Sequence, residues 1–494
     1  MYYRIIIVIN LLCIFCLYGC NTSINNAVPL DQFPDIFPDY VNVTIPYHIA
    51  PLNFRLLHNG EKIKVRFLHN DHVLFETNGR RGVKIPVNAW HKMLQQSAGD
   101  TLQVQVYSLQ TGKWYAYQPF HLYVSTDSMD PYIVYRLIDP GYELWGRMGI
   151  FQRNVSNFDE SVIITNKITG NNCINCHSFH DYCPDRMMFH SRGEQFAGTF
   201  LLVDGHSQRV NTQTEHAVSA GSYPIWHPSG DYIAFSSNVT NQSFHTLAGK
   251  RIEVYDNESD LVVWDIKKNV MLRDTRFTTK DCWETFPAWS PDGHWLYYCF
   301  ADGSEKNVPS ESKQLIYGLS RVDFNASTGR FGQQIDTIVN PATSDKSISF
   351  PRLSPDGRYL LYTTSASATF PIWHKEANLE MIDLLNHSTI DMKEINSDEA
   401  DSYHAWSSNG RWILFSSRRI NGLYTHLFFA YFDLSGQIHK PFLLPQKNPE
   451  YYTRLLKSYN IPEFVNGKVD MNPYEISKTL KGETVQLTEI MQDK

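Results

Sequence analysis

Four windows in the second half of the chain repeat one pattern of apolar and polar positions. They read YPIWHPSGDYIAFSS from Tyr223, FPAWSPDGHWLYYCF from Phe286, FPRLSPDGRYLLYTT from Phe350 and YHAWSSNGRWILFSS from Tyr403. Each window has an aromatic start, a large apolar residue after a two-residue step, a polar turn that ends in Gly, and an alternating apolar segment. Glycine supplies the positive φ that closes a tight turn, and alternation is the periodicity of a strand. Each window therefore predicts a β-hairpin.

The spacing of the windows leaves room for two further strands in each unit, because the windows start 53 to 64 residues apart. Apolar segments occupy this space at residues 261–266, 314–323, 379–384 and 426–434. Four strands per repeat are typical of a β-propeller blade. The windows resemble the TolB-like β-propeller repeat, also called PD40 or WD40-like, over residues 173 to 440. The alternative is a repeated hairpin in another all-β fold.

A divergent fifth unit lies upstream, in the segment CHSFHDYCPDRMMFHSR at residues 176–192. Phe179 stands where the other windows carry Trp or Leu, and RMMF stands where they begin their second strand. Residues 130–170 and a strand near Pro441–Leu444 are candidates to form or close a sixth unit. The resemblance therefore implies a propeller of five or six blades at residues 127–445.

The first part of the chain has a different pattern. Between residues 44 and 126, short alternating segments separated by turns predict a small immunoglobulin-like β-sandwich. Residues 446–494 include helix-like stretches and predict a partly helical tail. The predicted fold is all-β, with a sandwich followed by a propeller.

Composition and charge narrow the range of functions. Aromatic residues make up 14% of the chain, which favours β-structure because their side chains pack well on pleated surfaces. The net charge is −7 and there is no long basic segment, so nucleic acid is not expected as a partner. The sequence contains no Gly-x-Ser-x-Gly elbow, no phosphate-binding loop and no His-Glu-x-x-His motif. The chain therefore shows none of these three catalytic motifs.

The N-terminal twenty residues resemble an export signal. Arg4 precedes an apolar stretch of 15 residues that ends in LYGC at Cys20, a length typical of a signal-peptide core and short for a membrane span. A small residue before a Cys resembles the cleavage site of bacterial lipoproteins. This implies removal of residues 1–19, a diacylglycerol on Cys20 and a tether at residues 20–43. A plain signal peptide and an uncleaved anchor are the alternatives. No acidic run follows Cys20, and the same resemblance implies the cell envelope, with attachment to the outer membrane facing the periplasm.

The stretch NCINCHSFH contains the pattern Cys-x-x-Cys-His at Cys173, Cys176 and His177. It resembles the attachment motif of c-type cytochromes, in which both cysteines form thioether bonds to the haem and the histidine ligates the iron. Such haem is attached outside the cytoplasm, in agreement with the predicted export. Two alternatives remain open. One is a zinc site of Cys173, Cys176 and Cys183 with His177 or His180, and the other is a Cys173–Cys176 disulfide or redox pair.

Met187 and Met188 follow the motif on the predicted second strand and are candidates for the sixth iron ligand. His180 and His190 are rivals. A methionine ligand would favour electron transfer, and ordinary core packing is the alternative for both methionines.

The resemblance also places the motif in the fold. The aromatic residue that opens each window would line the central channel, and Cys176 takes its place in the divergent unit, so we expect the haem at one mouth of the channel. His404 stands at the same rim, where other windows have Pro, and is a candidate functional histidine. The alternative is a histidine hydrogen-bonded inside the rim. Cys183 and Cys282 have no assigned role, and Cys299 is predicted to be a buried small apolar residue of a strand.

These features predict an exported, lipid-anchored protein that binds haem c through Cys173, Cys176 and His177. Its expected role is electron transfer or the sensing of redox state or a small ligand. A haem peroxidase-like activity is the enzymatic option. The propeller would be the scaffold for an envelope protein or a redox donor or acceptor. The alternative function is an envelope module that binds protein or glycan, with a structural cysteine cluster that holds zinc or a disulfide and no haem.

Overall fold

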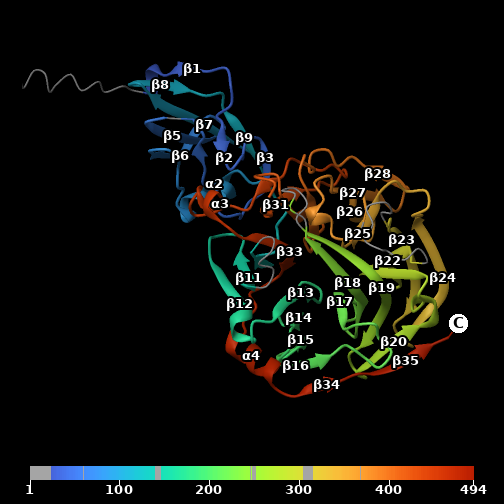
Figure 1. Cartoon of the computed structure of the whole chain (residues 1–494). Coiled ribbons are helices and arrows are strands. Elements are labelled where there is room, and N and C mark those ends of the chain that lie inside the picture. The colour runs from blue at the N-terminus through green and yellow to red at the C-terminus, as the bar shows by residue number, and fades with distance from the viewer. Residues whose placement is uncertain are drawn as a thin grey trace, which may run out of the picture. The chain divides into compact units, whose positions relative to one another are not determined.

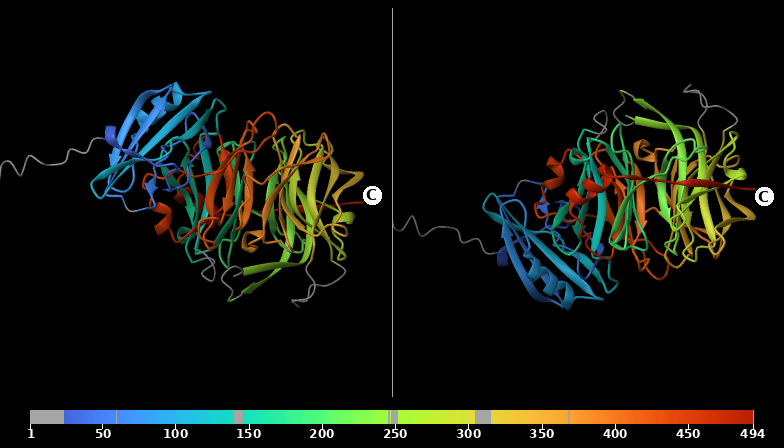
Figure 2. Two further views of the ribbon diagram at one scale, coloured as in Figure 1. Left: turned by 90° about the horizontal axis from the view of Figure 1, so that it is seen from above. Right: turned by 90° about the horizontal axis from the view of Figure 1, so that it is seen from below.

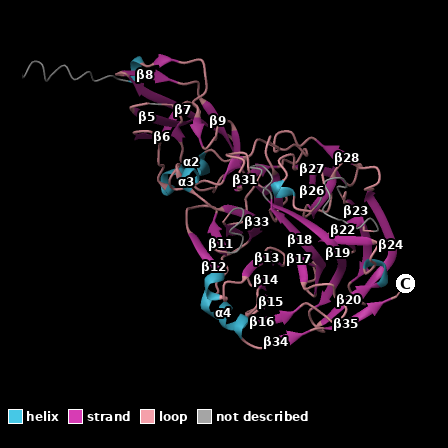
Figure 3. Ribbon diagram, in the orientation of Figure 1, coloured by secondary structure: helices cyan, strands magenta, loops and turns pink. Residues whose placement is uncertain are grey.

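The structure is a computed structural model that describes residues 24–58, 60–139, 146–244, 246, 252–303, 315–367 and 369–493. The chain divides into two compact units, which are described separately. The first comprises Met1–Tyr47, Pro51–Ser125 and Pro445–Tyr452, and the second comprises His48–Ala50, Thr126–Leu444 and Thr453–Lys494. Strands dominate both units (Figure 3). The predicted signal peptide and Cys20 lie outside the described residues.

The second unit is a six-bladed β-propeller (Figure 1). Blade 1 consists of β12 (Glu160–Thr165), β11 (Met148–Asn154), β10 (Tyr132–Ile138) and β33 (Ser458–Val465). Blade 2 consists of β13 (Cys173–Phe179), β14 (Arg186–Arg192), β15 (Gly198–Val203), β16 (His206–Asn211) and β34 (Thr484–Gln486). Blade 3 consists of β17 (Gly221–Trp226), β18 (Tyr232–Phe244), β19 (Ile252–Asp265), β20 (Val270–Asp274) and β35 (Thr488–Gln492).

The remaining three blades have four strands each. Blade 4 consists of β21 (Cys282–Trp289), β22 (Trp295–Asp302), β23 (Gly318–Asn325) and β24 (Arg330–Val339). Blade 5 consists of β25 (Ser347–Leu353), β26 (Tyr359–Ser365), β27 (Asn378–Asp383) and β28 (Ser388–Ile390). Blade 6 consists of β29 (Asp401–Trp406), β30 (Trp412–Ser417), β31 (His426–Tyr431) and β32 (Phe442–Leu443). Short 3-10 helices occur at Asn166–Ile168, Thr275–Phe277 and Pro371–Trp373.

The four repeated windows form the predicted hairpins. In blades 3 to 6, the first two strands of each blade pair antiparallel. Gly230, Gly293, Gly357 and Gly410 close the turns with φ between +67° and +73°. A side chain is disfavoured at this φ, which explains why every window has Gly there. The all-β propeller expected from the repeats is confirmed, and six is the number of blades.

Blade 1 is completed from the far end of the chain. Its innermost strand, β33, pairs antiparallel with β10, although more than three hundred residues separate the two strands in sequence. The strand near Pro441–Leu444, a predicted candidate for closing the ring, is instead β32 on the outer side of blade 6. The C-terminal residues also include α3 (Tyr451–Arg454) and α4 (Pro473–Lys481), and β34 and β35 extend blades 2 and 3 by parallel pairing. The tail is therefore partly helical, but its strands are part of the propeller.

Large apolar side chains fill the spaces between blades. Between blades 1 and 2, Ile150, Ile174, Met187 and Phe200 pack in one cluster that also takes Leu480 from α4. A separate cluster between blades 2 and 3 includes Met188, Phe235 and Trp264. Burial of this much apolar surface is the main stabilising contribution in such a fold.

The hairpin of β18 and β19 is longer than the others, with strands of 13 and 14 residues. It extends beyond the propeller body on one side (Figure 2). Val239 and Phe244 on this extension are 37% and 49% exposed.

The first unit contains a seven-stranded sheet of β1 (Val28–Pro29), β3 (Val43–Pro46), β5 (Lys62–His69), β6 (His72–Gly79), β7 (Thr101–Gln110), β8 (Lys113–Ala116) and β9 (Phe120–Ser125). It also has a two-stranded sheet of β2 (Ile36–Phe37) and β4 (Arg55–Leu56), the 3-10 helix Ile24–Asn26, and α2 (Val87–Gln96). The predicted strands are present. The immunoglobulin-like arrangement stays a prediction. The described strands of this unit include two parallel pairs, and α2 was not expected.

Candidate functional site

The six innermost strands of the propeller carry the same irregularity where they line the central channel. One non-glycine residue in each has a φ between 45° and 53°, next to a shift in strand register. These residues, the neck ring, are Cys176, Tyr223, Phe286, Phe350, Tyr403 and Ile461. A positive φ is uncommon for such residues, and its repetition around one channel marks a position that the fold imposes on every blade.

The residue after each member of the neck ring divides the six strands into two kinds. It is Pro in β17, β21, β25 and β33 and His in β13 and β29, namely Pro224, Pro287, Pro351, Pro462, His177 and His404. The neck ring, the two histidines and three of these prolines, Pro224, Pro287 and Pro462, line a small cavity of about 40 Å³. The two histidines are therefore the chemically distinct positions of a sixfold pattern.

Aromatic contacts hold much of the neck ring together. The ring centroids of Tyr223 and Phe286 are 4.5 Å apart, those of Phe286 and Phe350 are 4.3 Å apart, and those of Phe350 and Tyr403 are 4.9 Å apart. Such pairs add about 0.5–1.5 kcal/mol each beyond the burial of their area. Cys176 and Ile461 complete the circle without aromatic rings.

The Cys-x-x-Cys-His sequence lies on β13, and the bulge changes which way its side chains face. In a regular strand, residues three apart point to opposite faces. Here the register shifts between Asn175 and Ser178, and Cys176 has a φ of 53°. Cys173 and Cys176 consequently line the same cavity, although their spacing would place them on opposite faces of a regular strand. Neither thiol is part of a disulfide.

This cavity is the larger of the two at the channel and has a volume of about 670 Å³. It adjoins the neck cavity at Cys176 and Tyr223, which line both. Its apolar wall includes Ile252, Ile372 and Trp373. The volume is in the range of about 300–1,000 Å³ that is usual for ligand pockets. We call it the mouth cavity.

His177 lines the neck cavity, not the mouth cavity, and is only 2% exposed. Neither ring nitrogen has a hydrogen-bond partner among the described residues. The carbonyl groups of Val134 and Ile461 face the ring, but neither forms a hydrogen bond of normal geometry with it. Burial, and then the positive charge of Arg136, lower the pKa of His177 to about 3, so the imidazole is neutral at pH 7. A buried neutral imidazole without partners is a potential metal ligand.

His404 is the counterpart of His177 in blade 6, and its environment differs. Its Nε2 lies 3.1 Å from the carbonyl oxygen of Leu361, and its Nδ1 lies 3.5 Å from Oγ1 of Thr363. Burial, and then the charge of Arg352, lower its pKa to about 3. This geometry matches the alternative interpretation of His404, namely a histidine that is hydrogen-bonded inside the rim.

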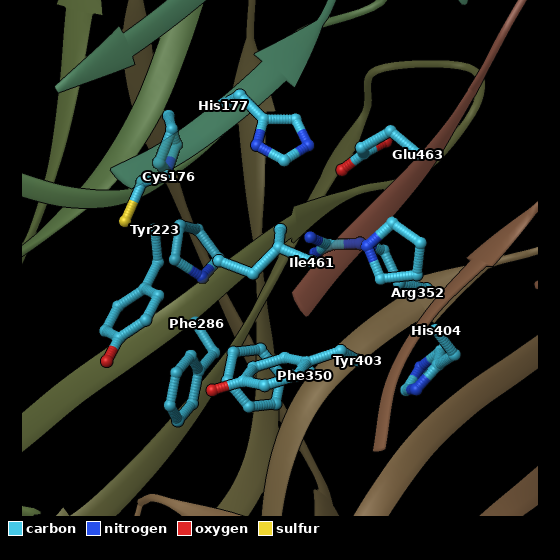
Figure 4. A pocket seen from close by; sticks show the side chains of 13 residues that line it. Cys176, His177, Tyr223, Phe286, Phe350, Arg352, Tyr403, His404, Ile461 and Glu463 are labelled. Carbon is cyan, nitrogen blue, oxygen red and sulfur yellow. The ribbon is translucent and has the colours of Figure 1, made fainter. Parts of the chain in front are cut away.

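Two charged residues line the neck cavity beside the histidines (Figure 4). Figure 4 shows the His177 imidazole between Cys176 and Glu463, with His404 beside Arg352. Burial raises the pKa of Glu463 to about 7 against the opposing effect of the Arg352 charge. Burial lowers the pKa of Arg352, and the Glu463 charge opposes this shift. The neck cavity therefore combines the largely aromatic neck ring with two charged side chains, Arg352 and Glu463.

The structure does not bring the predicted methionine ligands to this site. Met187 and Met188 are both fully buried on β14, one in the core between blades 1 and 2 and the other between blades 2 and 3. Neither residue lines the mouth cavity or the neck cavity. Their placement matches ordinary core packing, the alternative reading of both residues.

The other predicted ligands also lie elsewhere. Nε2 of His180 is 3.0 Å from the carbonyl oxygen of Pro228. Nδ1 of His190 is 2.8 Å from Oγ1 of Thr199. Cys183 follows the far end of β13, so a strand of seven residues separates it from Cys173. At about 3.3 Å per residue, that distance excludes a shared zinc site in this conformation. Among the described residues, no group of three or more His, Cys, Asp or Glu side chains could hold a metal ion.

The remaining cysteines lie in blade 4. Cys299 is fully buried in an apolar cluster of β22, as the sequence predicts. Cys282 is half-buried at the start of β21, and burial, with the neighbouring Glu284 carboxylate, raises the pKa of its thiol. A thiol with a raised pKa is a poor nucleophile at neutral pH, so Cys282 stays without an assigned role.

Comparison with known proteins finds solved structures of similar fold, but no matching protein family and no matching curated protein. Among solved structures, a puromycin-hydrolyzing peptidase of Mycobacterium tuberculosis is 13% identical with a TM-score of 0.36, over 56% of this chain and 39% of the peptidase. A hypothetical selenium-binding protein from Sulfolobus tokodaii is 10% identical with a TM-score of 0.39, over 75% of this chain and 91% of that protein. An oligogalacturonate lyase in complex with manganese is 10% identical with a TM-score of 0.35, over 63% and 74% of the two chains.

These similarities are too distant to carry an argument about activity. The chain spans well under half the length of the peptidase, so nothing of that enzyme's activity is transferred to it. None of the described helices is long and apolar enough to cross a membrane.

Sequence reasoning missed the residues that line the channel from blade 1. The segment IPEF at Ile461–Phe464 has the same order as FPAW and FPRL in the repeated windows. It lacks the turn and second strand that follow those windows, because its partner β10 comes from the other end of the propeller. A search for a large apolar residue followed by Pro, without requiring the turn and second strand of a hairpin, would have found this segment.

Proposed function

We propose that this propeller is an exported, lipid-anchored protein that holds a c-type haem at the mouth of its central channel and uses it for electron transfer or ligand sensing. Cys173 and Cys176 would hold the haem, each thiol adding across one vinyl group so that no by-product leaves. His177 would ligate the iron. When bound, the haem would supply a one-electron redox couple or an iron site for a small ligand.

The single observation that supports this proposal best is the break in alternation at Cys176. It places two free thiols on one wall of a cavity of ligand size, with a neutral and unpartnered imidazole as the next residue. These are the two thiols and the one nitrogen ligand that the attachment chemistry requires, although burial raises the pKa of the Cys173 thiol. Buried imidazole nitrogens usually have partners, so the unpartnered imidazole of His177 supports a role as a ligand.

The chain's own residues also determine what surrounds such a group. The aromatic side chains of the neck ring would line the channel beside such a group. His404, Arg352 and Glu463 line the same neck cavity as His177. Met187 and Met188 lie in the cores between blades and line neither cavity.

The test is to express the full chain in the periplasm of cells with a haem-attachment system. We expect a haem stain that persists after denaturing electrophoresis and a sharp α band of a c-type haem in the reduced spectrum. Cys173→Ala combined with Cys176→Ala should abolish the persistent stain, whereas Cys299→Ala, a matched change of a buried thiol outside the site, should retain it. A colourless wild-type protein would contradict the proposal.

The membrane anchor has its own test. Cys20 lies outside the described residues, so this part of the proposal rests on the signal-like N-terminus. Labelling with a fatty-acid probe should mark the wild-type chain, and Cys20→Ser should remove the label and release the protein from the envelope fraction. An unlabelled wild-type chain would contradict lipidation but would leave the haem proposal intact.

A second function is favoured by the long β18–β19 hairpin, which carries exposed Val239 and Phe244 beyond the propeller body. An exposed apolar extension of this kind is typical of a surface that binds another protein or a glycan in the envelope. This binding role would be independent of haem. The double cysteine variant separates the two, because it would lose haem and keep partner binding.

A further inference from the structure

Two guanidinium groups lie near the thiol of Cys173, and the attachment of haem uses neither of them. Arg192 is the cross-strand partner of Cys173 in the pairing of β13 with β14. Arg136, from blade 1, donates a hydrogen bond to Asn175, two residues further along β13. The charges of both arginines oppose the rise in the pKa of Cys173 that burial causes. Since all four residues line the mouth cavity, two cations from neighbouring blades reach the same part of it.

Arg136 is a buried cation without a counter-ion in the described part of the chain. It is 6% exposed and takes part in no ion pair there. Its one hydrogen bond to a described residue runs from Nη1 to the side-chain oxygen of Asn175, which also accepts from the backbone N–H of Cys176 at 2.8 Å. Its Nε has no partner. A buried charge is costly unless an opposite charge and hydrogen bonds compensate it, so this guanidinium favours an anion in the cavity.

Arg192 is exposed, but its guanidinium is held in place. Its Nη2 donates to the carbonyl oxygen of Gly221 at 3.0 Å and to Oγ of Ser222 at 2.7 Å. Its other N–H groups have no hydrogen-bond partner among the described residues. A guanidinium that is already ordered loses little side-chain entropy when it binds a carboxylate.

The other charged residues of the cavity do not neutralise these two arginines. Asp139 pairs with Arg147 at 3.2 Å, and Glu194 is exposed and forms no ion pair with a described residue. The guanidinium of Arg418 also lines the cavity, but it stacks on the ring of Trp373 at 3.3 Å and is already engaged. The mouth cavity therefore keeps two cations that no carboxylate of the described chain pairs with.

The rest of the lining suits an apolar group. The volume of about 670 Å³ is far larger than a carboxylate alone needs. Burial of apolar ligand surface against apolar side chains is favourable, so a ligand that fills this space has an apolar body beside its acidic group. The apolar side chains that line it are Ile252, Val254, Phe370, Ile372 and Trp373.

We propose that the mouth cavity binds an organic carboxylate with an apolar body, and that Arg136 and Arg192 pair with its carboxylate group. Both guanidinium groups have N–H donors that no described residue occupies, and a carboxylate accepts such donors in pairs. The thiol of Cys173 would lie beside the bound acid. Neither His177 nor a haem takes part, so the inference goes beyond the proposed function and is tested on haem-free protein.

The test compares a carboxylate probe with its neutral counterpart. The full chain, made in cells that lack a haem-attachment system and kept reduced, is titrated with phenylacetate and with phenylacetamide by isothermal titration calorimetry. Hydrogen bonds to a charged group are stronger than those to a neutral one, so we expect phenylacetate to bind at a single site at least about tenfold more tightly than the amide. Arg136→Gln and Arg192→Gln should each weaken phenylacetate about tenfold and leave the amide unchanged.

The matched control is Arg209→Gln. Like Arg136, Arg209 has an Nε without a partner, and like Arg192 it donates from Nη2 to a backbone carbonyl, that of Gly482 at 2.7 Å. It does not line the mouth cavity, so its replacement should leave the binding of both probes unchanged. Because Arg192 is exposed, Arg192→Gln tests the site even where loss of the buried Arg136 impairs folding.

Three results would overturn the proposal. The first is equal affinity for phenylacetate and phenylacetamide, or a loss in Arg209→Gln as large as in the two cavity variants. The second is binding of acetate or inorganic phosphate as tight as that of phenylacetate, which would show an anion site that makes no use of the apolar lining. The third is no binding of either probe. None of these results bears on haem attachment, which the persistent haem stain measures separately.

Discussion

Strands β13 and β29 each place a histidine directly after a neck-ring residue with positive φ, yet the two histidines differ in their partners. His177 and His404 are 2% and 4% exposed, and burial lowers the pKa of each to about 3. Both ring nitrogens of His404 have a polar neighbour within 3.5 Å, whereas neither nitrogen of His177 has a hydrogen-bond partner among the described residues.

The difference shows that burial and fold position do not by themselves make a site. His404 is accounted for by the carbonyl of Leu361, to which its Nε2 can donate. His177 satisfies neither nitrogen, although buried polar groups in proteins nearly always do. The unsatisfied residue is also the one preceded by Cys173 and Cys176. The unpartnered imidazole is therefore in blade 2, and its counterpart in blade 6 is hydrogen-bonded.

The largest effect expected from this comparison follows from replacing each histidine by the residue that four other blades have. His177→Pro and His404→Pro should both fold, because Pro224, Pro287, Pro351 and Pro462 occupy the equivalent backbone position. In protein made with a haem-attachment system, His177→Pro should lose the axial nitrogen ligand completely, and its ferric and ferrous spectra should change accordingly. His404→Pro should retain the wild-type spectrum, at a stability cost of about 1 kcal/mol for the lost hydrogen bond.

Absorption spectra and thermal unfolding of the two variants check this directly. Identical spectra for both variants and the wild type would show that His177 is not an iron ligand and that the two strands are equivalent. Failure of both to fold would show that the backbone of the proline blades is not shared by β13 and β29, which would break the comparison at its structural level.

The sequence predicted the parts of this comparison that depend on local pattern. Alternation and the Pro–Asp–Gly type of turn predicted the hairpins, and the register of the windows correctly placed Cys176 beside Tyr223, Phe286, Phe350 and Tyr403 on the channel. Both inferences succeed because turn residues and strand alternation are set by the backbone within a few residues.

What the sequence could not predict depends on contacts between distant segments. The closure of blade 1 by β33 pairs residues from opposite ends of the propeller, and no local signal specifies the partner. The hydrogen bond from Arg136 to Asn175 joins two blades, so no local sequence pattern predicts it. The arrangement of the first unit shows a related limit of local patterns. Alternating strands specify a sheet, but not the order of strands or the helix that separates β6 from β7.

A smaller and more quantitative contrast comes from replacing each histidine by Leu in protein that carries no haem. Both imidazoles titrate near pH 6.5 when unfolded and near 3 when folded, so the unfolded state binds more protons between these values. Stability must therefore fall as the pH drops below 6.5, by on the order of 3 kcal/mol per histidine at pH 4. Each Leu variant should lose this part of the pH dependence, so that urea unfolding at pH 4 and pH 7 differs less in the variant than in the wild type.

At pH 7 the proton contribution vanishes and only the hydrogen bonds remain to separate the two positions. His404→Leu should destabilise by about 1–2 kcal/mol, because the buried carbonyl of Leu361 loses its donor. His177→Leu should be neutral or stabilising, since it removes two unsatisfied nitrogens from an apolar environment and breaks no hydrogen bond. If His177→Leu is as destabilising as His404→Leu at pH 7, then His177 has a structural partner in the haem-free protein. Its lack of one would then no longer support a ligand role. If instead only His404→Leu destabilises, the imidazole of His177 is retained at a cost to the haem-free chain, as expected for a residue that the ligand satisfies.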